Sequence, residues 1–315
     1  MSKGRNFTVE NQHMSQRDIF WTRVGELMRE DEDIVIVTAD MGTPVFDKIR
    51  TIYPHRFFNV GIAEQNCISV ASGLALEGKK PYIFNIATFA ILRAFEQIRV
   101  GVSIMNLPVT IVGTGTGFSY DDAGPTHHLF EDIAAMRTLP NITINSASDN
   151  VMARKLADIS REMSTPNYVR LERHINPDIY ETNDDFSKGF QVIREGLDGC
   201  IISNGFMLWK AFEIADELSK HGKNVSVIDL HTYPCKENNL VQTLEGIPSI
   251  ITIEENFLPG GIMELLGDRQ IHKNIKRFGV KQEWVYRYGG REHNHEFHGI
   301  DTKTLIKETK MFMGV

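Results

Sequence analysis

The chain has 315 residues, a formal net charge of −7 and an ordinary globular composition, with 42% hydrophobic and 24% charged residues. This length predicts about two domains, each able to bury its own core. No stretch approaches the roughly 20 apolar residues that span a bilayer, and the polar N-terminus lacks the apolar region of a secretory signal. The acidic balance offers no basic face for nucleic acid. Three distant cysteines argue against a disulfide framework and favour a reducing cytoplasm: Cys67, Cys200 and Cys235.

The sequence alternates short runs rich in Val and Ile, typical of buried strands, with amphipathic helical stretches. A first helix is expected over 16–29, capped by Ser15 with Asp18 three residues later. Strands are then expected at 33–40, 80–87, 108–115, 141–147 and 166–171, and helices at 62–77, 90–104, 129–138 and 149–162.

The polar segment 174–195 contains Pro177 and interrupts this alternation, so we interpret it as a linker or crossover. Strands resume at 199–205, 224–230 and 248–256, with helices at 207–221, 236–245 and after Gly260-Gly261. The alternation predicts an α/β fold of two domains, each with a mainly parallel sheet flanked by helices. We place the domains at 1–174 and 195–315, joined by a linker over 175–194.

The segment NVGIAEQNCISVASGLALEG (59–78) predicts a helix that is buried around most of its surface, with Glu64 in the first turn. A carboxylate at a helix N-terminus is favoured by the helix dipole, so a simple capping charge is one interpretation. The other is a buried acid that hydrogen-bonds a ligand nitrogen and shares a proton with it. Further along, Phe89, Leu92 and Phe95 form an apolar stripe that fits either plain core or a cofactor wall.

Two groups of polar residues have the types that bind metals or substrates. One occupies the loop 113–132, whose glycine spacing is not the dinucleotide fingerprint. Its acids and histidines fit either metal ligands or substrate-binding groups at the carboxyl end of a parallel strand: Asp121, Asp122, His127 and His128. The other group loosely suggests a metal site or solvated histidines on a polar loop: His293, His295 and His298.

Together these segments resemble the pyrimidine-binding and C-terminal domains of the transketolase family, over about residues 15–310. The most specific is Gly61-Ile62-Ala63-Glu64-Gln65, which is similar to the family's G-I-x-E-Q/H element. Similar segments follow in order: TF–x3–RAFEQIR (88–99), GPTHH (124–128), EDIAAMRTLPN (131–141), VIDLHT (227–232) and IEENFLPGGI (253–262). Several matching elements in order favour the ligand-binding interpretation of Glu64 over the capping interpretation.

The resemblance implies a thiamine-diphosphate enzyme in which Glu64 contacts the aminopyrimidine ring and activates the cofactor. A glutamate bonded to the ring nitrogen favours the tautomer that accepts the proton from the thiazolium carbon. Phe89 resembles the family's stacking aromatic, and Asp40 of VTADMG resembles an acid near the cofactor. The apolar wall would be completed by Ile86, Leu92 and Phe95.

On the substrate side, His127 matches the proton-transferring histidine of the family's D-G-x-T-H motif. Arg173 resembles the arginine that binds the substrate's phosphate, with Arg170 as the competing candidate; a guanidinium suits phosphate because its donors are planar. Asp122 and His128 are also expected to contact the substrate. Ala123 stands where the family carries an aspartate, Gly115 where it carries a histidine and His128 where it carries a glutamine, which predicts an altered or specialised sugar substrate.

The sequence contains nothing similar to the family's diphosphate and Mg²⁺ motif, G-D-G followed by a later Asn. The near-match at 196–199 has no such Asn and opens a predicted strand. The resemblance therefore implies a split enzyme, active only with an N-terminal subunit that supplies the Mg²⁺ ligands. We expect two copies of each chain, with this chain forming the dimer core.

Three other functions fit the same segments. The β-subunit of a 2-oxo acid dehydrogenase E1 shares the two-domain plan, and a deoxyxylulose-phosphate synthase would condense pyruvate with a sugar phosphate. A non-catalytic homologue is supported only by the altered loop around Ala123. The GIAEQ and GPTHH elements favour the transketolase and deoxyxylulose-phosphate synthase alternatives over the E1 alternative.

Overall fold

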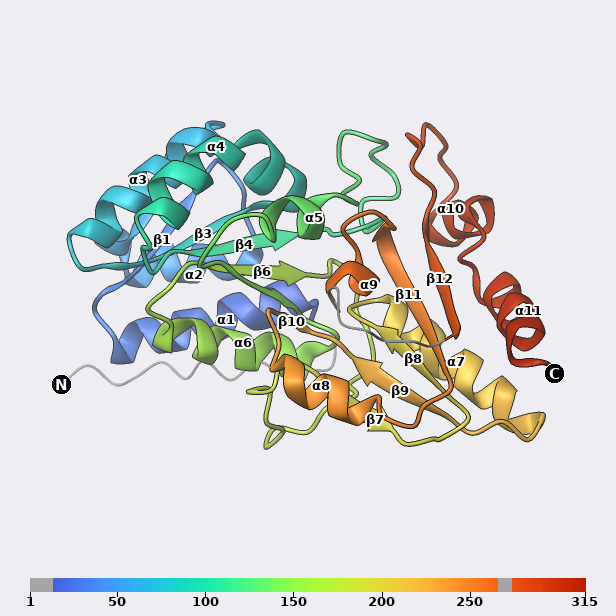
Figure 1. Cartoon of the computed structure of the whole chain (residues 1–315). Helices are drawn as coiled ribbons and strands as arrows, with labels where there is room; N and C mark the ends of the chain where they lie inside the picture. The colour runs from blue at the N-terminus through green and yellow to red at the C-terminus, as the bar shows by residue number, and fades with distance from the viewer. Residues whose placement is uncertain (1–13, 266–273) are drawn as a thin grey trace.

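The computed structural model describes residues 14–265 and 274–315, which form two α/β units (Figure 1). A seven-stranded sheet organises the first unit and a five-stranded sheet the second. Most neighbouring strands in both sheets run parallel, and helices flank both sheets, so the predicted fold class is confirmed. No helix within the described ranges is long and apolar enough to cross a membrane.

The first sheet has the strand order β10-β5-β6-β4-β3-β1-β2. Its strands are β1 (Ile34–Thr38), β2 (Phe57–Asn59), β3 (Lys80–Ile86), β4 (Thr110–Thr114), β5 (Thr143–Ser146), β6 (Asn167–Leu171) and β10 (Thr232–Tyr233). All are parallel except β10, which returns from the second half of the chain and pairs antiparallel with β5. The second half of the chain therefore completes the edge of the first sheet.

Helices cover both faces of the first sheet because successive side chains of each buried strand point to opposite faces. Tyr82 and Phe84 of β3 pack into one core with α1 (Gln16–Glu30), α2 (Pro44–Ile52) and α6 (Asn150–Glu162). Ile83, between them, packs into the other core. That core is covered by α3 (Glu64–Leu76), η3 (Phe89–Arg93), α4 (Phe95–Gln97), η4 (Ile98–Ile104) and α5 (Asp132–Met136).

The second sheet has the strand order β12-β11-β8-β9-β7. Its strands are β7 (Gln191–Arg194), β8 (Gly199–Ser203), β9 (Val225–Asp229), β11 (Ser249–Phe257) and β12 (Asn274–Val280). Only β7 is antiparallel. The helices of this unit are α7 (Met207–Lys220), α8 (Glu237–Thr243), α9 (Ile262–Leu265), α10 (Arg291–His298) and α11 (Thr302–Met313).

Several elements differ from the sequence-based expectations. The predicted linker is packed: Tyr180 and Phe186 are buried in the first core, and residues 191–194 form β7 at the edge of the second sheet. The helix expected over 90–104 is interrupted by π-helical turns, which occur frequently at functional sites. The elements that the sequence did not predict are α2, η2 (Pro54–Arg56), β2, β10, β12, α10 and α11.

Candidate functional site

Five predicted site residues meet at one edge of the first sheet. Asp40 follows β1, Glu64 follows β2 and Phe89 follows β3, while His127 lies in the loop after β4 and Arg173 follows β6. These five strands run parallel, so their carboxyl ends lie at the same edge. Ligands of open α/β sheets bind at this edge. The residues that were grouped by resemblance are therefore also grouped by topology.

Glu64 is the first residue of α3, and only 5% of it is exposed. Its Oε1 accepts a hydrogen bond from Nη1 of Arg93 over 2.7 Å, and its Oε2 forms no such bond within the described chain. No side chain caps this helix, so the positive end of the helix dipole also favours the carboxylate. The site therefore contains a sheltered acid with one oxygen available to a ligand.

Phe89 and Arg93 belong to the π-helical turn η3 that follows β3. The Arg93 guanidinium lies 4.3 Å from the centre of the Phe89 ring, and the His127 ring meets the same phenyl group edge to face at 5.1 Å. Thr88 Oγ1 donates to the carbonyl oxygens of His127 and His128 at 3.1 and 3.3 Å. This turn therefore presents an aromatic face beside Glu64 and ties the 115–128 loop to it.

His127 is half-buried, and its burial lowers the pKa of the imidazole below the ordinary value. Its Nδ1 lies 2.9 Å from Thr126 Oγ1, and its Nε2 forms no hydrogen bond within residues that the structure describes. The Tyr120 ring lies 5.7 Å away. A neutral imidazole with one uncommitted nitrogen is suited to accept or return a proton at neutral pH.

Arg173 lies at the exposed side of the same edge. Its Nη1 is 3.3 Å from Oδ1 of Asp122, and its guanidinium lies 4.8 Å from the centre of the Tyr120 ring. Its side chain is 37% exposed, so it can reach an anionic ligand. Arg170, the competing candidate, is instead wholly engaged in a buried ion pair with Asp132, which excludes it as an accessible phosphate-binding group.

Asp40 is exposed and has a left-handed backbone conformation, with φ of 58°. Its N–H donates to Asn59 Oδ1 at 3.0 Å, and Asn59 Nδ2 donates back to Asp40 Oδ1 at 3.1 Å. This pair joins the ends of β1 and β2 beside a cavity of about 100 Å³. The other residues lining the cavity are Thr38, Met41, Gly42, Phe46, Arg50 and Phe57.

The three residues expected to complete the apolar wall lie in different surroundings. Ile86, the last residue of β3, is buried at 8% exposure, whereas Leu92 is 37% exposed. Phe95 is half-buried and packs against the core beneath α3. Of the three side chains, Leu92 is therefore the most accessible to a ligand.

His128 is 4% exposed, and its ring packs 5.1 Å from the Phe118 ring at the boundary of the two units. Burial lowers the pKa of His128. His298 lies against the other side of Phe118, at 5.4 Å. The position of His128 favours a role in packing beneath the candidate site.

The metal sites suggested by the acid and histidine spacings are not formed. Within 14–265 and 274–315 there is no group of three or more His, Cys, Asp or Glu residues that could hold a metal ion. His295 instead bonds Glu255 and Lys210, and His298 Nδ1 accepts from the Lys281 N–H at 3.1 Å. The spacing of these histidines serves structural contacts.

The near-match to the diphosphate motif lies at the opposite end of the second unit's sheet. Asp198 accepts the Asn224 N–H at 2.6 Å and precedes β8, at the amino end of that strand. Glycines at the amino end of a strand do not open onto the ligand-binding edge. The interpretation of this segment as the start of a strand is confirmed.

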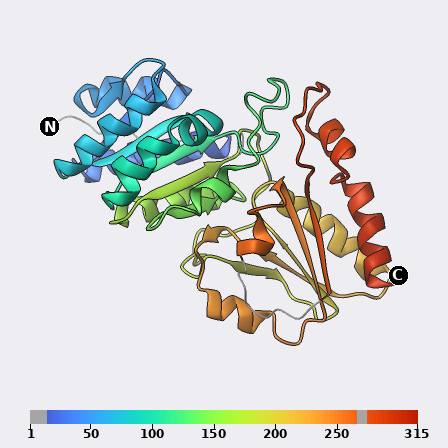
Figure 2. The ribbon, with the colours of Figure 1, turned by 45° about the horizontal axis from the view of Figure 1, so that its top comes forward.

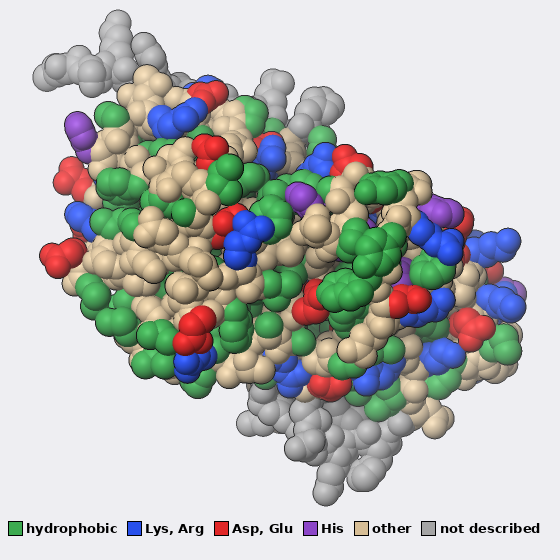
Figure 3. Space-filling model, turned by 90° about the horizontal axis from the view of Figure 1, so that it is seen from above, with side chains coloured by type: hydrophobic (Ala, Val, Ile, Leu, Met, Phe, Trp, Pro, Cys, Tyr) green, Lys and Arg blue, Asp and Glu red, His purple; other side chains and the backbone are tan. Residues whose placement is uncertain are grey.

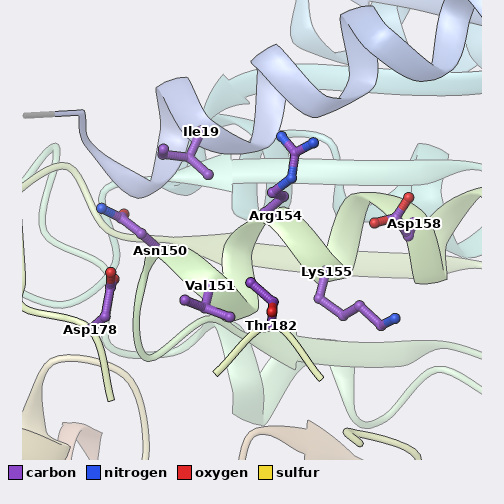
Figure 4. A pocket seen from close by; sticks show the side chains of 8 residues that line it. All are labelled: Ile19, Asn150, Val151, Arg154, Lys155, Asp158, Asp178 and Thr182. Atoms are coloured by element: carbon purple, nitrogen blue, oxygen red, sulfur yellow. The ribbon is translucent and has the colours of Figure 1, made fainter. Parts of the chain in front are cut away.

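A second hollow, of about 170 Å³, lies between α1, α6 and the segment after Asp178 (Figure 4). Its lining residues are Ile19, Asn150, Val151, Arg154, Lys155, Asp158, Asp178 and Thr182. It contains none of the predicted site residues, and its helices cover the sheet face opposite α3. Its basic and acidic side chains are mixed, and Arg154 is paired with Glu26. We assign no chemistry to it.

Sequence reasoning missed three residues that organise the site: Arg93, Glu172 and Arg291. Arg93 was present in the TF–x3–R segment, and its spacing of four from Phe89 is the signal that places both on one helical face. Glu172 and Arg291 are 119 positions apart in the chain yet form an ion pair at 2.8 Å. No local pattern predicts such a pair.

Comparisons with known proteins agree with this geometry. Models of the transketolase pyrimidine-binding domain and the transketolase C-terminal domain match residues 12–177 and 189–305. One of the subunits of the apulose-4-phosphate transketolase of Phocaeicola vulgatus is 31% identical, with coverage of 97% of this chain and 99% of the relative. The 1-deoxy-D-xylulose-5-phosphate synthase of Caldanaerobacter subterraneus is 32% identical over 92% of this chain but only 48% of its own length. A solved split-gene transketolase, described as an inactive β4 tetramer, superposes with a TM-score of 0.85 at 28% identity, covering 96% of this chain and 99% of that one.

Proposed function

Because the chain belongs to the transketolase family, we propose that it is the C-terminal subunit of a split transketolase-like enzyme. The reaction would transfer a two-carbon ketol unit between sugar phosphates with thiamine diphosphate as cofactor. The observation that carries this proposal is Glu64, a sheltered carboxylate beside the Phe89 ring with Oε2 available to a ligand nitrogen. The chain spans nearly the whole of the apulose-4-phosphate transketolase relative and about half of the synthase, which supports a split enzyme.

The site residues fit the pyrimidine half of the cofactor. Glu64 would hold the ring nitrogen through Oε2, and Phe89 would pack on the ring, with Ile86, Leu92, Phe95 and Asp40 around it. When bound, thiamine diphosphate supplies a carbon nucleophile for the donor's carbonyl group. Glu64 would keep a proton at the ring nitrogen while that nucleophile forms, because a carboxyl sheltered from water is suited to share it. The Mg²⁺ that binds the diphosphate would take its ligands from the partner chain.

The substrate would lie between the 115–128 loop and Arg173. His127 would hold or move a proton at the donor's hydroxyl through Nε2, while Arg173 and Asp122 would fix the far end of the sugar phosphate. His128 would support this loop from below. The Ala123 substitution removes a hydroxyl-binding acid, which supports a specialised sugar.

The proposal also includes self-association and a partner chain. The helices above the first sheet expose large apolar side chains to solvent, as Figure 3 shows from that side. These residues are Ile62, Leu76, Leu92, Val100, Ile104 and Met105. Exposed apolar side chains gathered on one side of a protein are typical of a protein interface. A cytoplasmic location is supported by the buried thiols Cys67 and Cys200, which form no disulfide.

A second candidate is a deoxyxylulose-phosphate synthase-like condensation of pyruvate with a sugar phosphate. The 32% identity to the synthase of Caldanaerobacter subterraneus favours it. Both reactions require Glu64, Phe89 and a cofactor. They differ in the donor, which is a ketose phosphate in one and a 2-oxo acid in the other.

The test is to purify the chain with the product of a neighbouring gene that carries the G-D-G motif. Turnover is then assayed with thiamine diphosphate, Mg²⁺ and either ketose phosphates or pyruvate. We expect ketol transfer by the complex and none by the chain alone. Glu64→Gln should lower kcat by about 10²–10⁴-fold with an unchanged melting temperature. Glu96→Gln, an exposed glutamate on the next helix, is the matched control. Full activity of Glu64→Gln would overturn the proposal.

A further inference from the structure

The second unit contacts the candidate site directly. The loop 115–128 and the segment 281–290 before α10 lie side by side in Figure 1 and in Figure 2. A side chain placed at Gly124 would meet the Tyr288 hydroxyl at 3.3 Å, and one at Gly290 would meet an oxygen of Asp121 at 3.7 Å. The predicted substrate loop is therefore supported by the C-terminal unit.

Arg291 is the centre of this contact. It is the first residue of α10, its exposure is 7%, and its guanidinium stacks 3.5 Å from the centre of the Phe206 ring. Its Nε and Nη2 bind the two oxygens of Glu255 at 2.8 and 2.5 Å. The same Nη2 lies 2.8 Å from Oε2 of Glu172, which belongs to the first unit. Its backbone N–H donates to Asp121 Oδ2 at 2.7 Å.

Glu172 passes this contact to the candidate site. Its second oxygen, Oε1, accepts the backbone N–H of Arg173 at 2.8 Å and the hydroxyl of Ser119. Its own N–H donates to Gln16 Oε1 at 2.8 Å, which anchors it to α1. One carboxylate thus holds the backbone of Arg173 and the base of the 119–122 turn, and Arg291 neutralises its charge.

The far side of the network is equally well defined. His295 bonds Glu255 through Nε2, and its Nδ1 lies 2.7 Å from the Lys210 ammonium. Because an ammonium group only donates, Nδ1 is the acceptor and Nε2 carries the proton. Gly117 completes the fit, since any side chain there would collide with Glu255. Arg291 therefore sits in a rigid socket that leaves its guanidinium one position.

We infer that Arg291 is a positioning residue of the C-terminal unit, which sets the substrate-binding loop 119–122 and Arg173 through Glu172 and Asp121. The ligand at that loop rests on the function proposed above, whereas the mechanical link rests on the contacts alone. Arg291 is too deeply buried to touch a substrate. It acts by fixing residues that do, and a guanidinium is required because only its fork bonds two carboxylates at once.

The first test needs only the full-length chain. Hydrogen exchange by mass spectrometry is compared between wild type, Arg291→Lys and the matched control Arg23→Lys, which alters another bidentate arginine, paired with Asp158 between α1 and α6. We expect Arg291→Lys to increase exchange at 117–124 and 172–174 without change at α3. Unchanged exchange at those segments in Arg291→Lys would overturn the inference. If Arg291→Lys does not fold, Glu172→Gln carries the same expectation.

The second test uses the complex with its partner chain. Arg291→Lys should raise KM for the phosphorylated substrate by about tenfold while kcat changes less and the half-saturating thiamine diphosphate concentration stays constant. A merely structural defect would lower all three together. An unchanged KM in an active complex would overturn the inference alone. An inactive wild-type complex that still shows the exchange changes would overturn the proposed function and leave the positioning role supported.

Discussion

Arg93 and Glu64 form an ion pair at the start of α3, and the same guanidinium covers the Phe89 ring. Nη1 lies 2.7 Å from Glu64 Oε1, and the guanidinium carbon lies 4.3 Å from the ring centre. The glutamate side chain is 6% exposed and the arginine side chain 47%. A single cation therefore stabilises the sheltered carboxylate and orders the aromatic face that the cofactor would use.

The first prediction concerns this cation. Arg93→Met in the assembled enzyme should lower kcat/KM by about tenfold, because it leaves the Glu64 carboxylate without its partner and the Phe89 ring less ordered. Arg93→Lys should retain part of the activity, since an ammonium can still pair with the carboxylate. Steady-state kinetics at neutral pH measures both. The control is Arg99→Met, which breaks an exposed pair with Glu96 on the same helical stretch. Equal kinetics for Arg93→Met and wild type would show that the pair has no functional part.

The second prediction concerns Arg173. Arg173→Met should raise KM for a phosphorylated substrate by roughly 10- to 100-fold, because charge-assisted bonds to phosphate are lost. The half-saturating concentration of thiamine diphosphate should stay constant, since Arg173 follows β6 and Glu64 follows β2 at the far end of the sheet. Arg194→Met, which breaks an exposed pair with Asp216, is the control. A uniform loss for phosphorylated and unphosphorylated sugars would contradict this role.

The sequence predicted most central strands to within a few residues, for a physical reason. Strands β1, β4 and β8 are buried at every position, so they form continuous apolar runs that stand out from their surroundings. The edge strands β7 and β10 have no such pattern, because they are half-exposed and short. Their places depend on strands from distant parts of the chain, which local patterns do not encode.

The same limit applies to the candidate site. Glu64, Phe89 and His127 lie in segments whose order resembles a family, and topology brings them to one sheet edge. The choice between Arg170 and Arg173 required contacts, because Arg170 is sequestered by Asp132, 38 positions away. The histidines of α10 resembled metal ligands only until their long-range partners were known.

The third prediction concerns the buried ion pair that removes Arg170 from the site. Asp132 is fully buried, bonds Arg170 Nε at 2.7 Å and accepts the Tyr168 hydroxyl at 2.7 Å. Asp132→Asn should lower the free energy of unfolding by about 3 kcal/mol, because it leaves the guanidinium buried without a counter-charge. Denaturant unfolding measures the loss. Asp47→Asn, at an exposed ion pair, should change it by less than about 0.5 kcal/mol. Equal losses in the two variants would contradict the prediction.

The last prediction concerns pH and Asp229 at the boundary between the two units. Burial raises the pKa of Asp229 from 3.8 to about 7, and its Oδ2 accepts the Tyr180 hydroxyl at 2.6 Å. The unfolded chain releases this proton near pH 4, whereas the folded chain keeps it until about pH 7. The contribution of Asp229 to stability therefore decreases as the pH rises from about 4 to about 7 and is constant above that range.

Asp229→Asn removes this titration while its amide oxygen can still accept the Tyr180 hydroxyl. The variant and the wild type should be similar in stability near pH 4.5, a value chosen close to the ordinary aspartate pKa. Near pH 7.5 the variant should be more stable by the order of 1–3 kcal/mol, because only the wild type then holds a buried charge. Urea unfolding at the two pH values measures the difference, with the exposed Asp216→Asn as the surface control. A stability difference that does not change with pH would show that Asp229 ionises as readily in the folded chain as in the unfolded one.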